Sequence, residues 1–290
     1  MSAPATIPLQ RPKTPRKAPK SSWRLTAAKL RNELKLLRHW WLWPHTSYRP
    51  FFVLATHRSG SNLLIDYLNR AGGISCHSEV LCPTLSFGPL SRRTGPHAAL
   101  HHIRRSLQTF SAPIRGCKLM LDQIERCQLT ADDLSDAFAG ARFIVLYRQS
   151  LAEQFVSLKT ASLTNQWVLL PGQEARMAQI RIERAELRAY CDQIKSYYGT
   201  LLATPGLAER AALLSYEELT ADPQYWLGEK ICPLVGAAAG HVETAMRKQN
   251  TRSVADQIEN YREVEALLLS PHCRQGYAWP GERRAYGRAA

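Results

Sequence analysis

The stretch FFVLATHRSGSNLLIDYLNRAGG, residues 51 to 73, decides the fold. It begins with an apolar run of the length of a buried strand, and its apolar residues then recur at the spacing of a helix with one inward face. A short polar loop with a glycine at position 60 joins the two. Such a loop gathers backbone N–H groups at one spot, and the dipole of the helix favours negative charge there. The stretch therefore predicts an anion-binding loop.

The side chains of this loop add hydrogen-bond donors. Its candidate binding residues are Arg58, Ser59, Gly60, Ser61 and Asn62. The loop departs from the G-x-x-x-x-G-K-[ST] pattern of magnesium-dependent kinases and ATPases, because no glycine opens it and no lysine follows Gly60. No acidic residue that would hold the metal is obvious at the end of a later strand. We therefore expect metal-independent chemistry, with an ordinary helix-capping turn and a nucleotide-dependent kinase as the alternatives.

The rest of the chain alternates short apolar runs with helical patterns. Further strands are expected over residues 114–120, 142–147 and 211–219, and helices near residues 97–109, 130–139, 150–163 and 173–202. This alternation indicates an α/β fold whose central, mainly parallel sheet is covered by helices on both faces. Ligands bind at the carboxyl ends of the strands of such sheets, so the loops after residues 56, 120 and 147 should converge on one site.

A second group of candidate residues follows the strand expected at 142–147. Arg148 comes directly after it, and Ser157 lies nine residues further on, in the next expected helix. A guanidinium and a hydroxyl near one edge of a sheet can form a second phosphate site. Taken singly, Arg148 is as well explained by a surface ion pair, and Ser157 by packing between helices.

The N-terminal part of the chain carries most of the positive charge. The formal net charge is +14, and the first 50 residues hold eleven basic residues against one acid. Residues 1–20, with five prolines and no acid, are expected to be a disordered basic arm. Residues 21–48 predict a basic amphipathic helix, whose apolar residues recur at steps of three and four: Trp23, Ala27, Leu30, Leu34, Leu37 and Trp41.

Two kinds of partner fit this helix. An anionic membrane surface could bind residues 21–43, which would place the protein on the inner face of the cytoplasmic membrane. Alternatively, the helix docks on its own domain or on a second subunit, as in a homodimer, with its basic face in water.

No run of about 18 apolar residues predicts a membrane span, and the N-terminus lacks the apolar core of a secretory signal. We therefore expect a cytoplasmic protein.

Cysteine and charge patterns bear on the remaining classes of function. The seven cysteines are scattered, odd in number and without a Cys-x-x-Cys pair, so we interpret them as reduced core thiols and expect no bound metal. A basic protein can also bind nucleic acid. Here, however, the charge lies mainly outside the α/β region, and basic and aromatic residues do not alternate as on an RNA-binding surface. We therefore keep nucleic-acid binding as an alternative and expect no nucleic-acid partner.

Seven segments in order resemble motifs of the bacterial carbohydrate sulfotransferases, the family that includes trehalose, nodulation-factor and lipopolysaccharide sulfotransferases. The segments are HRSGSNLL, CHSEVL, GCKLMLDQ, IVLYRQSLAEQFVS, TNQW, LLSYEEL and IEN, and the resemblance covers residues 50–265. It implies a P-loop-like three-layer α/β/α domain over residues 49–270, followed by a basic tail at 271–290. It also implies 3′-phosphoadenosine 5′-phosphosulfate (PAPS) as donor and a carbohydrate or glycolipid as acceptor. Because sulfuryl transfer from PAPS needs no metal, the missing lysine is accounted for.

The resemblance assigns donor-binding roles within the chain. The loop residues 58–62 would hold the 5′-phosphosulfate, and Arg148 with Ser157 would hold the 3′-phosphate. Many relatives carry an arginine eight residues before this serine, where this chain has Gln149. Trp167 would stack on adenine or line the acceptor site, with a core tryptophan as the structural alternative.

The resemblance also implies catalytic residues. The acceptor hydroxyl must lose a proton as it attacks sulfur, and relatives place their proposed catalytic glutamate in a segment comparable to that of Glu79. His77 is the alternative base, since imidazole titrates near neutral pH. Lys118, inside an otherwise apolar strand, could stabilise charge that develops on the sulfuryl group. A solvated loop carboxylate and a lysine at a strand end are the structural alternatives for Glu79 and Lys118.

Overall fold

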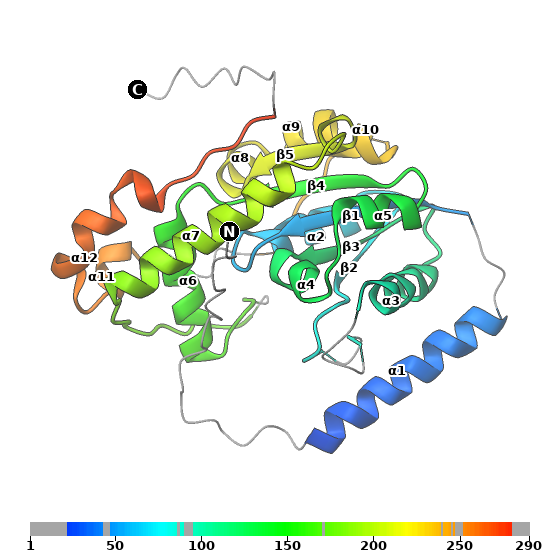
Figure 1. Cartoon of the computed structure of the whole chain (residues 1–290), viewed down its shortest axis with the longest axis horizontal. Coiled ribbons are helices and arrows are strands. Elements are labelled where there is room, and N and C mark those ends of the chain that lie inside the picture. Colours follow the sequence, from blue (N-terminus) through cyan, green and yellow to red (C-terminus); the bar gives the residue numbers. More distant parts are fainter. Residues whose placement is uncertain are drawn as a thin grey trace, which may run out of the picture.

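The computed structural model describes residues 22–42, 47–85, 88–89, 95–169, 172–238, 240–244, 246 and 252–279. Its centre is a five-stranded parallel sheet in the order β2-β3-β1-β4-β5 (Figure 1). The strands are β1 (Arg49–Ala55), β2 (Ile74–Glu79), β3 (Ile114–Met120), β4 (Arg142–Tyr147) and β5 (Ala211–Ser215). The helices are α1 (Ser22–Leu42), α2 (Ser61–Arg70), α3 (Pro96–Gln108), α4 (Leu121–Arg126), α5 (Ala131–Ala137), α6 (Leu151–Thr164), α7 (Arg184–Leu202), α8 (Tyr216–Ala221), α9 (Pro223–Tyr225), α10 (Cys232–Val235), α11 (Val254–Gln257) and α12 (Tyr261–Leu268).

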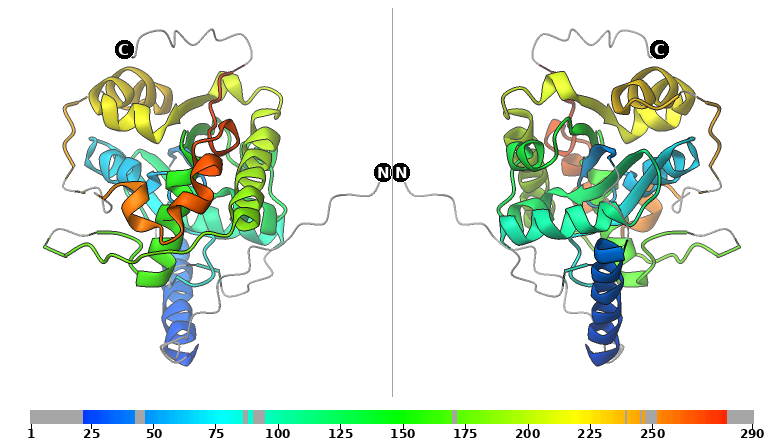
Figure 2. Two further views of the ribbon diagram at one scale, coloured as in Figure 1. Left: turned by 90° about the vertical axis from the view of Figure 1, so that its left-hand side faces the viewer. Right: turned by 90° about the vertical axis from the view of Figure 1, so that its right-hand side faces the viewer.

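Strand β1 lies in the middle of the sheet, between β3 and β4. Its residues after Arg49 are all buried, as expected for a strand that is covered on both faces. Phe51 and Val53 belong to one apolar cluster, and Phe52 and Leu54 to the other. Helices α2 and α10 cover the first cluster, and α3, α6 and α7 cover the second (Figures 1 and 2). The expected α/β/α layering around a parallel sheet is therefore confirmed.

Two strands differ from the sequence patterns. β2 was not expected, because it is an edge strand in which polar residues outnumber apolar ones and no apolar run marks it. β5 ends at Ser215, short of the expected end at 219, because α8 begins there. The hydroxyl of Ser215 accepts the backbone N–H of Glu218, whose carboxylate in turn accepts the backbone N–H of Ser215. This reciprocal cap starts a helix where the apolar run alone suggests a longer strand.

The long helix expected near residues 173–202 begins only at Arg184. Ahead of it the chain is extended, and Ile180 forms a parallel bridge with Ile258. Ile180 and Ile182 are both buried, and their spacing of two residues is that of an extended chain. Pairing with a segment distant in the sequence thus prevails over the local helical pattern.

The chain continues to pack on the domain beyond residue 270, where the sequence interpretation placed the start of a basic tail. Cys273 and Trp279 are buried in the main apolar cluster. The side-chain amide of Gln275 donates a hydrogen bond of 2.8 Å to the backbone carbonyl of Arg148. Residues 271–279 therefore belong to the folded domain, and the rest of the expected tail lies outside the described residues.

Helix α1 lies apart from the three layers and contacts α3 (Figure 1). It covers most of the amphipathic segment expected at 21–48, whereas the basic arm expected at 1–20 lies outside the described residues. Among the helices that the structure describes, α1 included, none is long and apolar enough to cross a membrane.

Candidate functional site

The loop between β1 and α2, residues 56–60, is the centre of the candidate site. Two of its residues have a positive φ, Arg58 at 63° and Gly60 at 87°. A positive φ is uncommon outside glycine and frequently marks a functional loop. Helix α2 begins at Ser61 without a side-chain cap. The N–H groups of Leu63 and Leu64 donate to the carbonyl oxygen of Gly60, whereas those of Ser61 and Asn62 have no partner among the described residues and remain available for an anion.

Ser59 adds a second, independent sign of a ligand at the loop. The residue is fully buried, and its hydroxyl oxygen has no hydrogen-bond partner among the described residues. Buried polar groups are nearly always paired, so an unpaired hydroxyl beside an uncapped helix N-terminus suits an anion that accepts a hydrogen bond from it. The sequence-predicted loop thus has the donors that an anion site requires.

Buried polar side chains from α6 and α7 fix the loop. Gln154 is fully buried and donates to the hydroxyl of Thr56 at 2.9 Å and to the carbonyl oxygen of His57 at 2.6 Å. The hydroxyl of Tyr198 lies 3.2 Å from that of Thr56 and donates to the carbonyl oxygen of Leu146 at 2.6 Å. The loop is therefore held in place by the protein itself, which reduces the reorganisation needed on binding.

A buried lysine lies beside the loop. Lys118, on β3, is 2% exposed, and its Nζ is 2.7 Å from Oδ1 of Asn62 and 3.0 Å from Oε1 of Glu79. The side-chain amide of Gln123 donates to the other carboxylate oxygen of Glu79 at 3.0 Å. Opposite charge and hydrogen bonds make the burial of this ammonium group tolerable. The structure thus brings together Lys118, Asn62 and Glu79, three residues that the sequence singled out.

A β-bulge at the end of β2 directs Glu79 toward this cluster. His77 is in register with Cys117 of β3, and Glu79 with Lys118, so that β2 accommodates Ser78 as an extra residue. Side chains alternate between the two faces of a strand, so without the bulge His77 and Glu79 would point to the same face. The bulge separates them and places Glu79 on the face of Lys118.

His77, the alternative base of the sequence interpretation, lies away from this cluster. Its Nε2 lies 3.0 Å from the carbonyl oxygen of Ser106 and 3.1 Å from the hydroxyl of Thr109. Its ring stacks on Phe110 with the centroids 4.0 Å apart, and burial lowers its pKa. These contacts lie under α3, on the other face of the sheet, and they explain His77 as a structural residue.

His57 and Asp122 form a pair at the loop that the sequence interpretation overlooked. Nε2 of His57 lies 3.4 Å from Oδ1 of Asp122, which is in α4 directly after β3. Burial lowers the pKa of His57, but the hydrogen bond and the charge of Asp122 raise it more, and the net pKa is raised. Burial raises the pKa of Asp122, whereas its bond to His57 lowers it more, and the net pKa is lowered.

The signal for this pair was present in the sequence. His57 is inside the predicted anion loop, and Asp122 follows residue 120, one of the three strand ends expected to converge. Asp122 is an acidic residue close to the end of a later strand, which the sequence interpretation did not consider. In the folded protein, its Oδ1 faces the imidazole of His57.

Arg58 connects the loop to Ser157 and Trp167. Its Nε donates to the hydroxyl of Ser157 at 2.9 Å, and its Nη1 donates to the carbonyl oxygen of Trp167. The indole of Trp167 is 42% exposed, and its centroid is 6.4 Å from that of the His57 ring. Ser157 and Trp167 therefore lie at the loop, although the contact of Ser157 is to Arg58 and not to Arg148.

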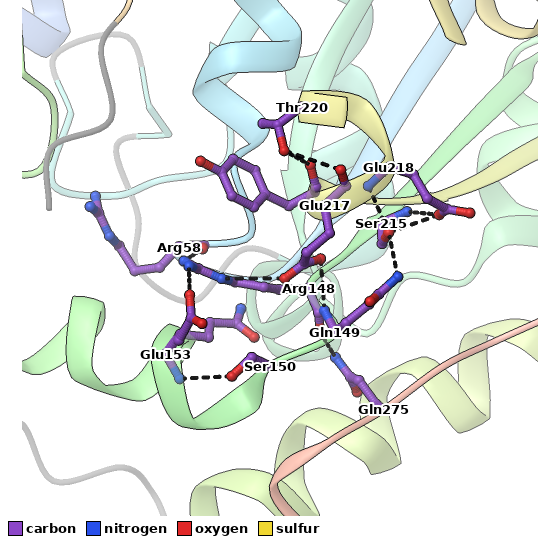
Figure 3. A network of polar contacts seen from close by, with 12 residues as sticks. Arg58, Arg148, Gln149, Ser150, Glu153, Ser215, Glu217, Glu218, Thr220 and Gln275 are labelled. Atoms are coloured by element: carbon purple, nitrogen blue, oxygen red, sulfur yellow. Dashed lines mark hydrogen bonds and ion pairs between the residues drawn. The ribbon is translucent and has the colours of Figure 1, made fainter. Parts of the chain in front are cut away.

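Arg148 lies between two carboxylates (Figure 3). Its Nη2 is 2.7 Å from Oε2 of Glu153, and its Nε is 3.8 Å from Oε1 of Glu217. A 3.5 Å hydrogen bond joins its Nη1 to the carbonyl oxygen of Arg58, and none joins it to Ser157 in the part of the chain that the structure describes. Arg148 and Ser157, which the sequence interpretation expects to share a phosphate, thus each contact Arg58.

Comparison with known proteins found similarity to solved structures, and the three described here have TM-scores below 0.5. No protein-family model matches the chain, and a search of curated protein sequences found no match. A sulfotransferase from Alicyclobacillus acidocaldarius is similar in structure, with 17% identity, coverage of 77% of this chain and 92% of that chain, and a TM-score of 0.45. A sulfotransferase from Mycobacterium tuberculosis has 12% identity, covers 80% of each chain and gives a TM-score of 0.46. A mouse sulfotransferase complexed with PAP has 15% identity, coverage of 76% of this chain and 66% of that chain, and a TM-score of 0.38.

Proposed function

We propose that the protein transfers a sulfuryl group from PAPS to a hydroxyl of a carbohydrate or glycolipid. The observation that carries the proposal is the position of Lys118 and Glu79 directly beside an anion-binding loop, with Nζ of Lys118 3.0 Å from Oε1 of Glu79. A cation and a proton acceptor next to an anion cradle are what transfer of an anionic group to a hydroxyl requires. The ordered series of sequence motifs supports this donor and this class of acceptor.

The loop would bind the 5′-phosphosulfate of the donor. The buried hydroxyl of Ser59 and the uncapped N–H groups at the start of α2 would donate to its oxygens. Arg58 and Ser157, which are joined by a hydrogen bond, would together bind a second phosphate, the 3′-phosphate. Arg148 would join them by exchanging one of its two carboxylate partners for the phosphate.

The transfer itself would need a cation and a base. The acceptor oxygen forms a bond to sulfur while the bond from sulfur to the phosphate oxygen breaks, and 3′-phosphoadenosine 5′-phosphate (PAP) leaves. Lys118 would turn from Glu79 toward the sulfuryl oxygens and stabilise the charge that develops there. This exchange frees Oε1 of Glu79, which would accept the proton of the acceptor hydroxyl.

His57 takes the place of His77 as the alternative base. Its Nε2 is paired with Asp122, while no hydrogen bond to its Nδ1 occurs among the described residues. The raised pKa of His57, which results from the bond and charge of Asp122 against the effect of burial, makes its neutral form a stronger base than an ordinary histidine.

Ligand binding followed by thermal unfolding tests the proposed donor. PAP should raise the melting temperature without magnesium, and AMP, which lacks the 3′-phosphate, should raise it much less. Equal effects of the two nucleotides would contradict the proposal. A nucleotide-dependent kinase predicts instead that stabilisation requires ATP with magnesium and that ATP is consumed. Incubation of the protein with radiolabelled PAPS and cell glycolipid extracts then identifies the acceptor.

A further inference from the structure

Helix α1 docks on the domain through its polar side. Lys29 is buried, and its Nζ donates to the carbonyl oxygens of Pro83, at 2.5 Å, and Pro89, at 2.8 Å. One turn further on, Glu33 forms an ion pair with Arg105 of α3 at 2.9 Å. Lys29 and Glu33, with the buried Leu36 after them, follow each other at steps of four and three residues and form one face of the helix.

The apolar side of α1 is left exposed. Leu30, Leu34 and Leu37 have 53%, 57% and 43% of their surface exposed, and their spacing of four and three residues places them in one row. They belong to the apolar series that defined the amphipathic helix in the sequence. The helix therefore does dock on the domain, but through the face next to the leucine row, roughly a quarter turn away around the helix axis, and the leucine row has no partner among the described residues.

Basic residues border the leucine row on one side. Arg31, Lys35 and Arg38 are exposed, and the single acid of the helix, Glu33, is already paired with Arg105. A second copy of this helix would bring like charges together, and the preceding arm, with five basic residues and no acid in residues 1–20, would do the same. The basic residues beside the leucine row thus favour an anionic partner, and the leucines themselves favour one with an apolar interior.

We propose that the leucine row and its basic border bind the surface of an anionic lipid membrane. A helix lying in the plane of the interface would bury Leu30, Leu34 and Leu37 at the boundary between headgroups and acyl chains, and the basic residues would contact the lipid phosphates. A membrane that contacts both the leucine row and the basic border would lie away from the face of Lys29 and Glu33, whose buried contacts hold the domain, so the domain would face water. Lipid binding at this face does not depend on which reaction the loop site performs.

Co-flotation of the full chain with vesicles tests this surface. The protein should float with vesicles of phosphatidylcholine and phosphatidylglycerol in a ratio of about 3:1, and much less with pure phosphatidylcholine. The triple variant L30Q/L34Q/L37Q should reduce the partition coefficient about tenfold or more, since it removes three apolar contacts. Glutamine has nearly the helix propensity of leucine, and all three positions are exposed, so the variant should fold.

Two further variants separate the contribution of the leucine row from those of other exposed leucines and of the basic residues. The double variant L163Q/L269Q removes two exposed leucines elsewhere, at 43% and 60% exposure, and should bind vesicles like the wild type. The variant R31Q/K35Q/R38Q should weaken both the preference for anionic vesicles and the dependence of binding on salt, while the five basic residues of residues 1–20 remain. Circular dichroism and the melting temperature verify that each variant is folded.

Three results would overturn the proposal. Vesicle binding that survives in L30Q/L34Q/L37Q would assign binding to another basic segment. A dimer in light scattering that is lost in the same variant, without vesicle binding, would identify a second copy as the partner. Binding of oligonucleotides that is abolished in R31Q/K35Q/R38Q but kept in L30Q/L34Q/L37Q, together with no vesicle binding, would identify a nucleic acid.

Discussion

Tyr216 packs directly on Gly60, so that a Cβ placed on Gly60 would lie 2.2 Å from Cδ2 of the Tyr216 ring. Gly60 also has a φ of 87°, in the left-handed region that residues with a Cβ rarely adopt. Tyr216 comes from the helix after β5, two strands away from β1 in the sheet. The contact with Tyr216 and the positive φ thus both require glycine at position 60.

The variant Gly60→Ala should therefore damage both binding and stability. We expect PAP affinity to fall about tenfold or more and the free energy of unfolding to fall by about 1–3 kcal/mol, because the Cβ adds strain and a clash. Gly199→Ala, at an exposed helical position where a Cβ would meet nothing within 4 Å, is the matched control and should gain up to about 1 kcal/mol. Titration calorimetry and urea denaturation measure the two effects. Wild-type affinity in Gly60→Ala would exclude the loop as the binding site.

Ser59→Ala should weaken binding without weakening the fold. The hydroxyl of Ser59 is buried with no partner among the residues described, so its removal leaves no protein group unpaired and should not lower the free energy of unfolding. Affinity for PAP and for AMP should fall together, by about tenfold, because both carry the 5′-phosphate. Ser215→Ala is the control: this serine is equally buried but caps α8, and its loss should lower the free energy of unfolding by about 1–2 kcal/mol. Equal destabilisation by both variants would show that the Ser59 hydroxyl has a structural role.

The loop and the positions of the sheet's central strands were predictable because their signals are local. The apolar run 51–56 and the polar loop after it lie within one short stretch, and the strands at 114–120 and 142–147 coincide with their apolar runs. The side-chain pairs at the site were less predictable. Glu79 reaches Lys118 through a β-bulge, and no periodic pattern reveals a bulge in a polar edge strand.

The contacts of Arg148 and Gln149 were also not predictable from the sequence. The sequence placed Arg148 and Ser157 together, but Glu153 and Glu217 lie close enough to Arg148 to hold it. Gln149, the departure from the family pattern, donates through its side chain to the hydroxyl of Ser215 at 3.0 Å. These contacts depend on which carboxylates and hydroxyls the fold brings near, and residue spacing does not specify that.

Ser157→Ala should discriminate between nucleotides with and without a 3′-phosphate. If Ser157 and Arg58 reach the 3′-phosphate, the variant should bind PAP about tenfold more weakly and AMP unchanged. Ser162→Ala is the matched control on the same helix, since its hydroxyl donates to the carbonyl oxygen of Leu158 and should leave both affinities unchanged. Titration calorimetry with the two nucleotides gives the comparison. Equal loss for PAP and AMP in Ser157→Ala would place Ser157 near the 5′-phosphate instead.

The pair His57 and Asp122 should make stability depend on pH. The folded-state pKa of His57 lies above its ordinary value of 6.5, because the bond and charge of Asp122 outweigh the lowering effect of burial. The contribution of His57 to the free energy of unfolding is therefore complete at pH values below 6.5, and it is lost as the pH rises through the pKa of the folded state. The pKa of Asp122 is lowered from 3.8, since its bond to His57 outweighs burial, so its contribution is complete above 3.8 and is lost as the pH falls through the folded value.

His57→Gln should consequently be more destabilising at about pH 5.5 than at about pH 8.5. Urea denaturation of the wild type and the variant at both pH values measures the difference. His241→Gln, at a side chain that is 73% exposed, is the control and should show no such difference. A loss that is the same at both pH values would mean that the contact with Asp122 contributes nothing through charge.

Glu79→Gln tests which residue accepts the proton. Because Glu79 would take the proton from the acceptor hydroxyl, the variant should lower kcat by about 10²–10⁴-fold, while PAP affinity changes little. His57→Gln should lower kcat by less than about tenfold and should leave the acidic limb of the pH–rate profile in place. Glu33→Gln is the matched control, since Glu33 is also a partly buried carboxylate in a cation pair, 2.9 Å from Arg105, and lies outside the site. A large loss of kcat in His57→Gln with near-normal activity in Glu79→Gln would assign the proton to His57, and Asp122→Asn should then shift the acidic limb to lower pH, because Asp122 holds the pKa of His57 up.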